Sequence, residues 1–264
     1  MPVSEVMEMS SLFIDERGEQ NPKSIIFLHA LGSSSQMWRH HVAALEQDFH
    51  CILVDLPSHG ASHNIEWTNF DDVVEMIVIK SKAHGKPHLV GLSLGGSLIL
   101  KLLEKHSSLI DRVIVDGASP QPIKGYRKII AIVYLMSFLK NTKFVANFLT
   151  KMMQEDGAPV QDVQRFVTDF QRAERRSFRR AMSQANLLRL DLQFDNPAFF
   201  ISGGKEAETI HDWHRRLAQK NVRSEYAYYP YKGHAWLFSD VDTHIQLLRY
   251  FFQNAAFPKK LKGF

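Results

Sequence analysis

Short apolar runs alternate with helix-like segments along most of the chain. Strand-like runs occupy residues 24–28, 51–56, 87–90, 112–115, 198–202 and 224–229, and residues 11–14 are expected to add an antiparallel edge strand. Helical patterns cover residues 36–47, 70–83, 95–106, 210–220 and 240–253. Strands that alternate with helices are typical of a largely parallel sheet covered by helices. The pattern therefore predicts an α/β fold.

The alternation stops between residues 120 and 194. No strand-like run occurs in this stretch, and its pattern predicts helices at residues 124–140, 143–154, 159–170 and 174–188. Pro159 suits the first position of a helix, where a backbone N–H is not needed. We therefore expect a core built from residues 1–119 and 195–264, with residues 120–194 forming an all-helical cap.

Composition places the chain among soluble globular proteins. Hydrophobic residues make up 45% and charged residues 23% of its 264 residues, which suits one α/β domain. The single cysteine, Cys51, excludes an internal disulfide and lies in an apolar run, so we expect it to be buried. The first eight residues carry acid where a signal peptide carries base. The most apolar window, residues 129–139, is shorter than the roughly 20 residues of a membrane span, which favours a cytoplasmic protein without a transmembrane segment.

The net charge of +4 is concentrated in the expected cap. Residues 120–194 hold thirteen Lys and Arg against six Asp and Glu, a local charge of +7 that leaves −3 elsewhere. Such asymmetry can mark a binding surface, although a solvated helical face is the simpler interpretation. No nucleic-acid recognition motif accompanies the charge, so no nucleic-acid partner is expected.

Ser93 is the candidate nucleophile. It is the centre of Gly91-Leu92-Ser93-Leu94-Gly95, which follows the strand-like run 87–90 and opens the helix at 95–106. A tight strand-to-helix turn pushes the central side chain outward, and small residues on either side prevent clashes. The N-terminus of the helix adds free N–H groups, which stabilise the negative charge that develops during acyl transfer.

His234 is the candidate base, because a serine hydroxyl needs a neighbouring base to become a good nucleophile. Of the thirteen histidines, His234 follows the last strand-like run and precedes the last helix, at the strand end where α/β sites form. Backbone N–H groups of Leu31, with Ala30 beside it, and of Leu94 are the expected oxyanion donors. His29 and His59 are expected to support loops.

A metal site is not expected. His211 and His214 lie three residues apart at a helix start, but no further ligands cluster near them in the sequence. We interpret both as surface polar residues. Acyl transfer through a serine nucleophile needs no metal or organic cofactor, and none is predicted.

Four motifs, in this order, resemble those of the α/β-hydrolase superfamily, and the resemblance covers nearly the whole chain. They are Phe27-Leu28-His29-Ala30-Leu31-Gly32 with Met37-Trp38, Asp55-Leu56-Pro57-Ser58-His59-Gly60-Ala61-Ser62, Gly91 to Gly95, and Gly233-His234. The first is similar to the oxyanion loop of small esterases and enol-lactonases, although Ala30 and Ser58 stand where glycine is usual. The resemblance implies an α/β-hydrolase fold, substrate contacts from Ala30 and Trp38, and a helical cap between the family's sixth and seventh strands.

The resemblance leaves the acid of a Ser-His-acid triad open. Glu206 stands where the family most often has Asp, after the strand-like run 198–202. Asp116, directly after the strand-like run 112–115, is the main rival, because some family members take their acid from the position after that strand. Glu208 is a third candidate. Glu206 is our prediction, since a glutamate can also orient imidazole.

The sequence therefore predicts a serine hydrolase that cleaves a carboxylic ester, or a related acyl bond, of a small hydrophobic substrate. The apolar window 129–139 either lines the acyl pocket or packs on the core. A serine at the elbow, rather than aspartate, disfavours dehalogenase and epoxide hydrolase activity in this family. The alternative is a catalytically silent or signalling member that binds a small hydrophobic ligand under its cap. A homodimer stays open.

Overall fold

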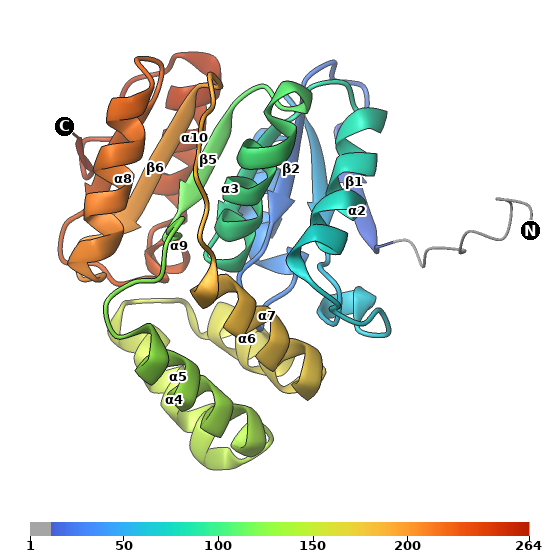
Figure 1. Cartoon of the computed structure of the whole chain (residues 1–264), viewed down its shortest axis with the longest axis vertical. Helices are drawn as coiled ribbons and strands as arrows, with labels where there is room; N and C mark the ends of the chain where they lie inside the picture. The colour runs from blue at the N-terminus through green and yellow to red at the C-terminus, as the bar shows by residue number, and fades with distance from the viewer. Residues whose placement is uncertain (1–11, 264) are drawn as a thin grey trace, which may run out of the picture.

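A single twisted sheet forms the centre of the molecule in the computed structural model, which describes residues 12–263 (Figure 1). Its strand order is β1-β3-β2-β4-β5-β6-β7-β8. The acidic N-terminal segment and Ser11, the first residue of the predicted edge strand, lie outside the described residues.

The six central strands are parallel, as the alternating pattern predicted. Edge strand β1 begins three residues later than predicted and pairs antiparallel with β3. Strand β8, which was not predicted, pairs antiparallel with β7. The ends of the other strands differ from the prediction by at most two residues. The strands are β1 (Ile14–Arg17), β2 (Ser24–Leu28), β3 (His50–Val54), β4 (His88–Leu92), β5 (Val113–Asp116), β6 (Ala198–Gly203), β7 (Glu225–Tyr229) and β8 (Lys262–Gly263).

Helices cover both faces of the sheet. One apolar cluster joins the sheet to α2 (Phe70–Ala83), α3 (Leu94–His106) and α8 (Glu208–Lys220). A second cluster joins the other face to α1 (Arg39–Leu45), α9 (Trp236–Ser239) and α10 (Val241–Gln253). Local capping fixes where some of these helices begin: the side chain of Asn69 accepts from Asp72 N–H at the start of α2, and Asp240 does the same for Thr243 at α10.

Four helices are inserted between β5 and β6, where the sequence predicted an all-helical segment. They are α4 (Tyr126–Leu139), α5 (Lys143–Glu155), α6 (Val160–Arg172) and α7 (Arg175–Leu187). Pro159 is the residue before α6 rather than its first helical residue, a one-residue difference. Figure 1 shows the four helices beyond the carboxyl ends of the parallel strands. We call them the cap.

Polar contacts tie the cap to the loops of the core. Ser34 Oγ donates to Asp169 Oδ2 of α6 at 2.6 Å, and Arg39 forms an ion pair with Asp162 of the same helix. Trp67 Nε1 donates to Gln184 Oε1 of α7 at 2.8 Å. Among residues 12–263, no helix has the length and apolar character needed to cross a bilayer.

Most of the apolar window 129–139 neither lines the cavity nor packs on the core. Only Ile129 reaches the cavity described below, and Ser137 is the one buried residue of α4. Ile132, Leu135 and Phe138 are exposed instead. Hydrophobicity alone could not reveal this, because only the position of α4 relative to α7 decides which face is covered. Cys51, by contrast, is buried as predicted, and burial raises the pKa of its thiol to about 12.

Candidate active site

The carboxyl ends of neighbouring parallel strands bring the predicted residues to one cavity. Ser93 follows β4, Gly117 follows β5, Glu206 lies after β6 and His234 after β7. All four line a cavity of about 450 Å³, which core loops, α3, α8 and the cap enclose together. Because parallel strands end at the same edge of the sheet, residues distant in sequence meet there.

Ser93 has the backbone geometry of a strained turn. Its φ is 56° and its ψ is −107°, between the last residue of β4 and the first of α3. Its N–H donates to the Asp116 carbonyl at 2.8 Å, which fixes the turn against β5. A Cβ on Gly95 would collide with the Leu28 carbonyl, so the chain can turn this tightly only with glycine at that position. The side chain of Ser93 therefore reaches the cavity at the N-terminal end of α3.

Glu206 holds His234 by a short hydrogen bond. Nδ1–H of His234 donates to Glu206 Oε2 at 2.7 Å, and Gly203 N–H donates to Oε1 of the same carboxylate at 2.9 Å. The carboxylate is 4% exposed, whereas the imidazole is 46% exposed. Both oxygens of Glu206 are thus committed, and the other nitrogen of the ring remains for a partner in the cavity.

The two groups change each other's proton affinity. Loss of hydration lowers the pKa of His234, but the negative charge and hydrogen bond of Glu206 outweigh it and raise that pKa to about 9. Burial raises the pKa of Glu206, yet the charge and the hydrogen bond of His234 lead to a net lowering. The pair therefore favours an ionised carboxylate beside an imidazolium, the state a base reaches after it takes a proton.

Asp116 has a different environment. It is completely buried, and burial together with the negative charge of Glu206 raises its pKa well above the usual range. Trp236 Nε1–H donates to its Oδ1 at 3.3 Å, and its other oxygen has no hydrogen-bond partner within the described part of the chain. This setting favours the neutral form of the carboxyl group, and His234 bonds Glu206 instead.

Gly117, the residue after β5, allows the His234 ring to approach the backbone closely. A Cβ on Gly117 would lie 2.6 Å from Cε1 and 2.7 Å from Nδ1 of His234, and the residue has a φ of +59°. Sequence reasoning did not select Gly117. The signal that could have found it was a glycine two residues after the predicted strand 112–115, next to the acid candidate Asp116.

The residues of the predicted oxyanion donors line the same cavity as Ser93. Leu31 follows β2 and Leu94 begins α3, and both line the cavity. The first N–H groups of a helix have no acceptor within it, so Leu94 N–H is available to a ligand. Ala30 and Trp38 are not among the residues that line the cavity; Trp38 is fully buried against Phe27 and His244.

Two buried histidines support the loop that carries Leu31, as predicted. His29 Nε2 accepts from Leu56 N–H at 2.9 Å, and His59 Nε2 accepts from Gly32 N–H at 3.0 Å. Burial lowers the pKa of His59 to about 3, so the ring stays neutral and can remain an acceptor. These bonds link the loops of the first two motifs, at residues 27–32 and 55–62.

The remaining cavity wall is mostly apolar. Of its residues, sequence reasoning selected only Ile129, through the window 129–139, because the packing of the other segments is not specified by the sequence pattern. The apolar side chains are Pro122, Ile123, Ile129, Met182, Ala185 and Ile210, and the polar ones include Ser97, Ser119, Gln121 and Asn186. An apolar cavity with few polar groups is typical of a small-molecule site.

The interpretation of His211 and His214 as surface residues is wrong. His211 is 7% exposed and His214 is fully buried. His214 Nε2–H donates to the Ala118 carbonyl at 2.8 Å, while His211 Nδ1 lies 2.9 Å from the Tyr226 hydroxyl. The helical spacing placed them on the inner face of α8, where they bond groups of the core.

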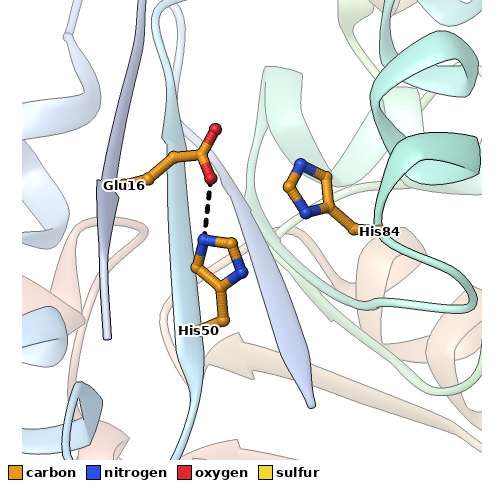
Figure 2. A group of neighbouring side chains, drawn as sticks. All are labelled: Glu16, His50 and His84. Atoms are coloured by element: carbon orange, nitrogen blue, oxygen red, sulfur yellow. Dashed lines mark hydrogen bonds and ion pairs between the residues drawn. The ribbon is translucent and has the colours of Figure 1, made fainter. Parts of the chain in front are cut away.

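Three side chains with metal-binding atoms do meet in the part of the chain that the structure describes. Figure 2 shows Glu16, His50 and His84, whose ligand atoms all lie within 4.8 Å of one another. His50 Nε2 is 2.7 Å from Glu16 Oε2, a hydrogen bond. Ligands that share a zinc ion at about 2.0–2.1 Å would be roughly 3.4 Å apart, so the cluster fits a carboxylate–imidazole pair better than a formed metal site. It lies at the amino end of β3, away from Ser93.

Comparisons with known proteins agree with this geometry. The solved structure of MenH from S. aureus superposes with a TM-score of 0.76 at 17% identity, covering 93% of this chain and 99% of that chain. The enol-lactonase from Burkholderia xenovorans LB400 gives a TM-score of 0.75 at 18% identity, covering 92% and 96%. These similarities confirm the predicted fold class.

Sequence similarity adds a family. The chain is 30% identical over 112 residues to the pimeloyl-[acyl-carrier protein] methyl ester esterase of Nitrosomonas europaea, covering 42% of this chain and 43% of that protein. The matched regions span about two fifths of the length of the curated relatives. The sequence profile described as "Alpha/beta hydrolase family" matches residues 25–243. The protein therefore belongs to the alpha/beta hydrolase family.

Proposed function

We propose that this hydrolase cleaves a carboxylic ester of a small hydrophobic substrate through an acyl-enzyme on Ser93. The observation that supports the proposal most is the hydrogen-bonded pair of His234 and Glu206, which shares one apolar cavity with Ser93. A nucleophile, a base and a group that orients the base are what acyl transfer requires.

The proposed reaction has two halves. Ser93 Oγ attacks the ester carbonyl while His234 takes its proton, and N–H groups of Leu31 and Leu94 stabilise the oxyanion. The tetrahedral intermediate collapses, His234 gives the proton to the departing alcohol, and the acyl group stays on Ser93. A water molecule, deprotonated by His234, then attacks the acyl-enzyme and releases the acid. Glu206 stays ionised and stabilises the imidazolium in both halves.

The cavity supports a small apolar acyl group. Its volume of about 450 Å³ and its isoleucine and methionine walls suit a short or medium chain. Two relatives are named as a methyl ester esterase and an enol-lactonase, and an ester and a lactone both contain an acyl–oxygen bond. Thioester, lactone, amide and carbon–carbon bond hydrolysis use the same machinery, so the ester is the proposed member of a wider class.

A series of p-nitrophenyl esters with increasing acyl length tests the proposal. We expect turnover that peaks at a short or medium chain and falls when the acyl group exceeds the cavity, measured as kcat/KM from p-nitrophenol release. Spontaneous hydrolysis without protein is the baseline. Absence of turnover across the whole series would leave the silent, ligand-binding alternative as the better account. The silent alternative was favoured by the open identity of the triad acid. The hydrogen bond between Glu206 and His234 weakens that alternative.

The pH dependence should follow the proton on His234. Only the neutral ring can take the Ser93 proton. Loss of hydration lowers the pKa of the ring, but Glu206, with a smaller contribution of the same sign from Asp116, outweighs it and raises that pKa to about 9. We therefore expect kcat/KM to increase about tenfold per pH unit below 9 and to level off above it. The measurement uses an uncharged ester, corrected for spontaneous hydrolysis at each pH. A midpoint below pH 7 would show that Glu206 does not act on the ring as its position requires.

A further inference from the structure

Helices α4 and α5 each expose a row of large apolar side chains. Leu135 is 62% exposed and Phe144 is 73% exposed. Residues three or four apart share one face of a helix, so each helix contributes one row. We call the set the cap stripe; it consists of Ile132, Leu135, Phe138, Phe144, Phe148 and Met152.

The cap stripe is at the end of the molecule and near the cavity. In Figure 1, α4 and α5 lie farther from the sheet than the other cap helices. Their opposite faces are already used, because α4 packs against α7 and α5 against α6. Ile129, one helical turn before Ile132, lines the cavity. The row on α4 therefore begins beside the wall of the candidate active site.

The surroundings of the cap stripe are cationic and contain no acid over a long stretch. No Asp or Glu occurs between Asp116 and Glu155, whereas six Lys and Arg do. Five of these cations are exposed: Lys124, Arg127, Lys128, Lys143 and Lys151. From α7, Arg175 and Arg179 place their guanidinium groups 5.4 Å and 4.7 Å from the ring centre of Phe138.

We propose that the cap stripe docks on an anionic lipid surface. Apolar rows flanked by Lys and Arg are the features that bind helices to the boundary between headgroups and acyl chains. An exposed patch of this kind on a monomer marks an interaction site. A second copy fits less well, because a twofold interface would bring the same cations together with no acid in the stretch to pair with them. This docking goes beyond the proposed function and does not depend on turnover.

Cosedimentation with vesicles tests the docking. We expect the protein to bind vesicles of phosphatidylglycerol and phosphatidylcholine in equal parts, and to bind pure phosphatidylcholine far more weakly. Replacing Lys124, Lys128 and Lys143 together by Gln should weaken binding about 100-fold, at about fivefold per cation. The control replaces exposed lysines elsewhere, Lys82, Lys86 and Lys259, and should keep binding within about fivefold.

The apolar part needs its own variant. Leu135→Gln with Phe148→Gln should weaken binding to the anionic vesicles at least about tenfold, because two buried side chains are lost from the lipid. The matched control, Ile79→Gln with Val222→Gln, changes two exposed apolar residues outside the cap and should bind as the parent does. Circular dichroism verifies folding of every variant.

Three results would overturn the proposal. They are no binding to anionic vesicles, equal binding to both vesicle types, and binding that the cap variants and their controls affect alike. A concentration-dependent dimer that Leu135→Gln with Phe148→Gln dissociates would assign the cap stripe to a second copy instead. Light scattering of the parent and the variant detects it. Because Ser93→Ala should bind vesicles like the parent, failure of docking and failure of the proposed hydrolysis are distinguishable.

Discussion

Replacing Ser93 by Ala is expected to lower kcat for ester hydrolysis by about 10⁵–10⁶-fold. The variant retains the cavity, His234 and the oxyanion N–H groups, but it has no oxygen that can bond to the acyl carbon. Alanine keeps the Cβ of serine and the same strained φ of 56°, so the substitution adds no new backbone strain. The measurement is turnover of the best p-nitrophenyl ester, together with mass spectrometry of the quenched protein.

The parent protein should show an added acyl mass on the peptide that contains Ser93, and the variant should not. Ser97 offers a matched control, because it is a serine in the first turn of α3 and lines the same cavity. Ser97→Ala should lose less than about tenfold in kcat, since its hydroxyl is not at the elbow. Equal losses in both variants, or turnover by Ser93→Ala at the parent rate, would contradict an acyl-enzyme on Ser93.

The sequence was most informative where local geometry and chemistry coincide. The strand ends and the helix starts are visible as periodicity changes, and Ser93 stands at a turn that few other residues tolerate. His234 was selected from thirteen histidines by its place after β7. These positions depend on the chain order of the strands, which the alternating pattern already contains.

Residues whose environment depends on packing between distant segments were less predictable. Trp38 was expected near the substrate, but it packs on the face of the sheet opposite α3, in the second apolar cluster. His211 and His214 were expected at the surface, and α8 turns them inward. The window 129–139 is the most apolar of the chain, and most of it is exposed because α7 covers only one side of α4. A one-dimensional pattern identifies an apolar face but not what covers it.

The acid was the member of the triad that sequence left open, and its test has the second largest expected effect. Glu206→Gln should lower kcat about 10³–10⁴-fold while the protein stays folded. Both carboxylate oxygens accept hydrogen bonds, one from Gly203 N–H and one from His234 Nδ1–H. A glutamine has one acceptor oxygen and one NH₂ group, so it cannot serve both donors. It either opposes the Gly203 N–H or forces His234 into the tautomer that cannot accept the Ser93 proton.

A readout beyond activity separates orientation from simple damage. Loss of the Glu206 charge should lower the pKa of His234 from about 9 toward its ordinary 6.5, because that charge is the main group that raises it. The pH profile of the residual activity should move in the same direction. NMR titration of the His234 ring in both proteins measures the shift directly. An unchanged ring pKa would show that the two side chains do not interact in solution.

Asp116→Asn is the matched comparison, and it should cost less than about tenfold. The pKa of Asp116 is raised well above its usual range, which favours the neutral carboxyl group, and asparagine is a neutral group of the same shape. Asparagine retains an oxygen that can accept from Trp236 Nε1. Should only Asp116→Asn abolish turnover, the acid would be Asp116, and the bond between Glu206 and His234 would have to be replaced during the reaction. If His234 left Glu206 for Asp116, the buried Glu206 carboxylate would lose its hydrogen bond to the ring. A buried charge without its partner is costly, so we expect the large loss in Glu206→Gln.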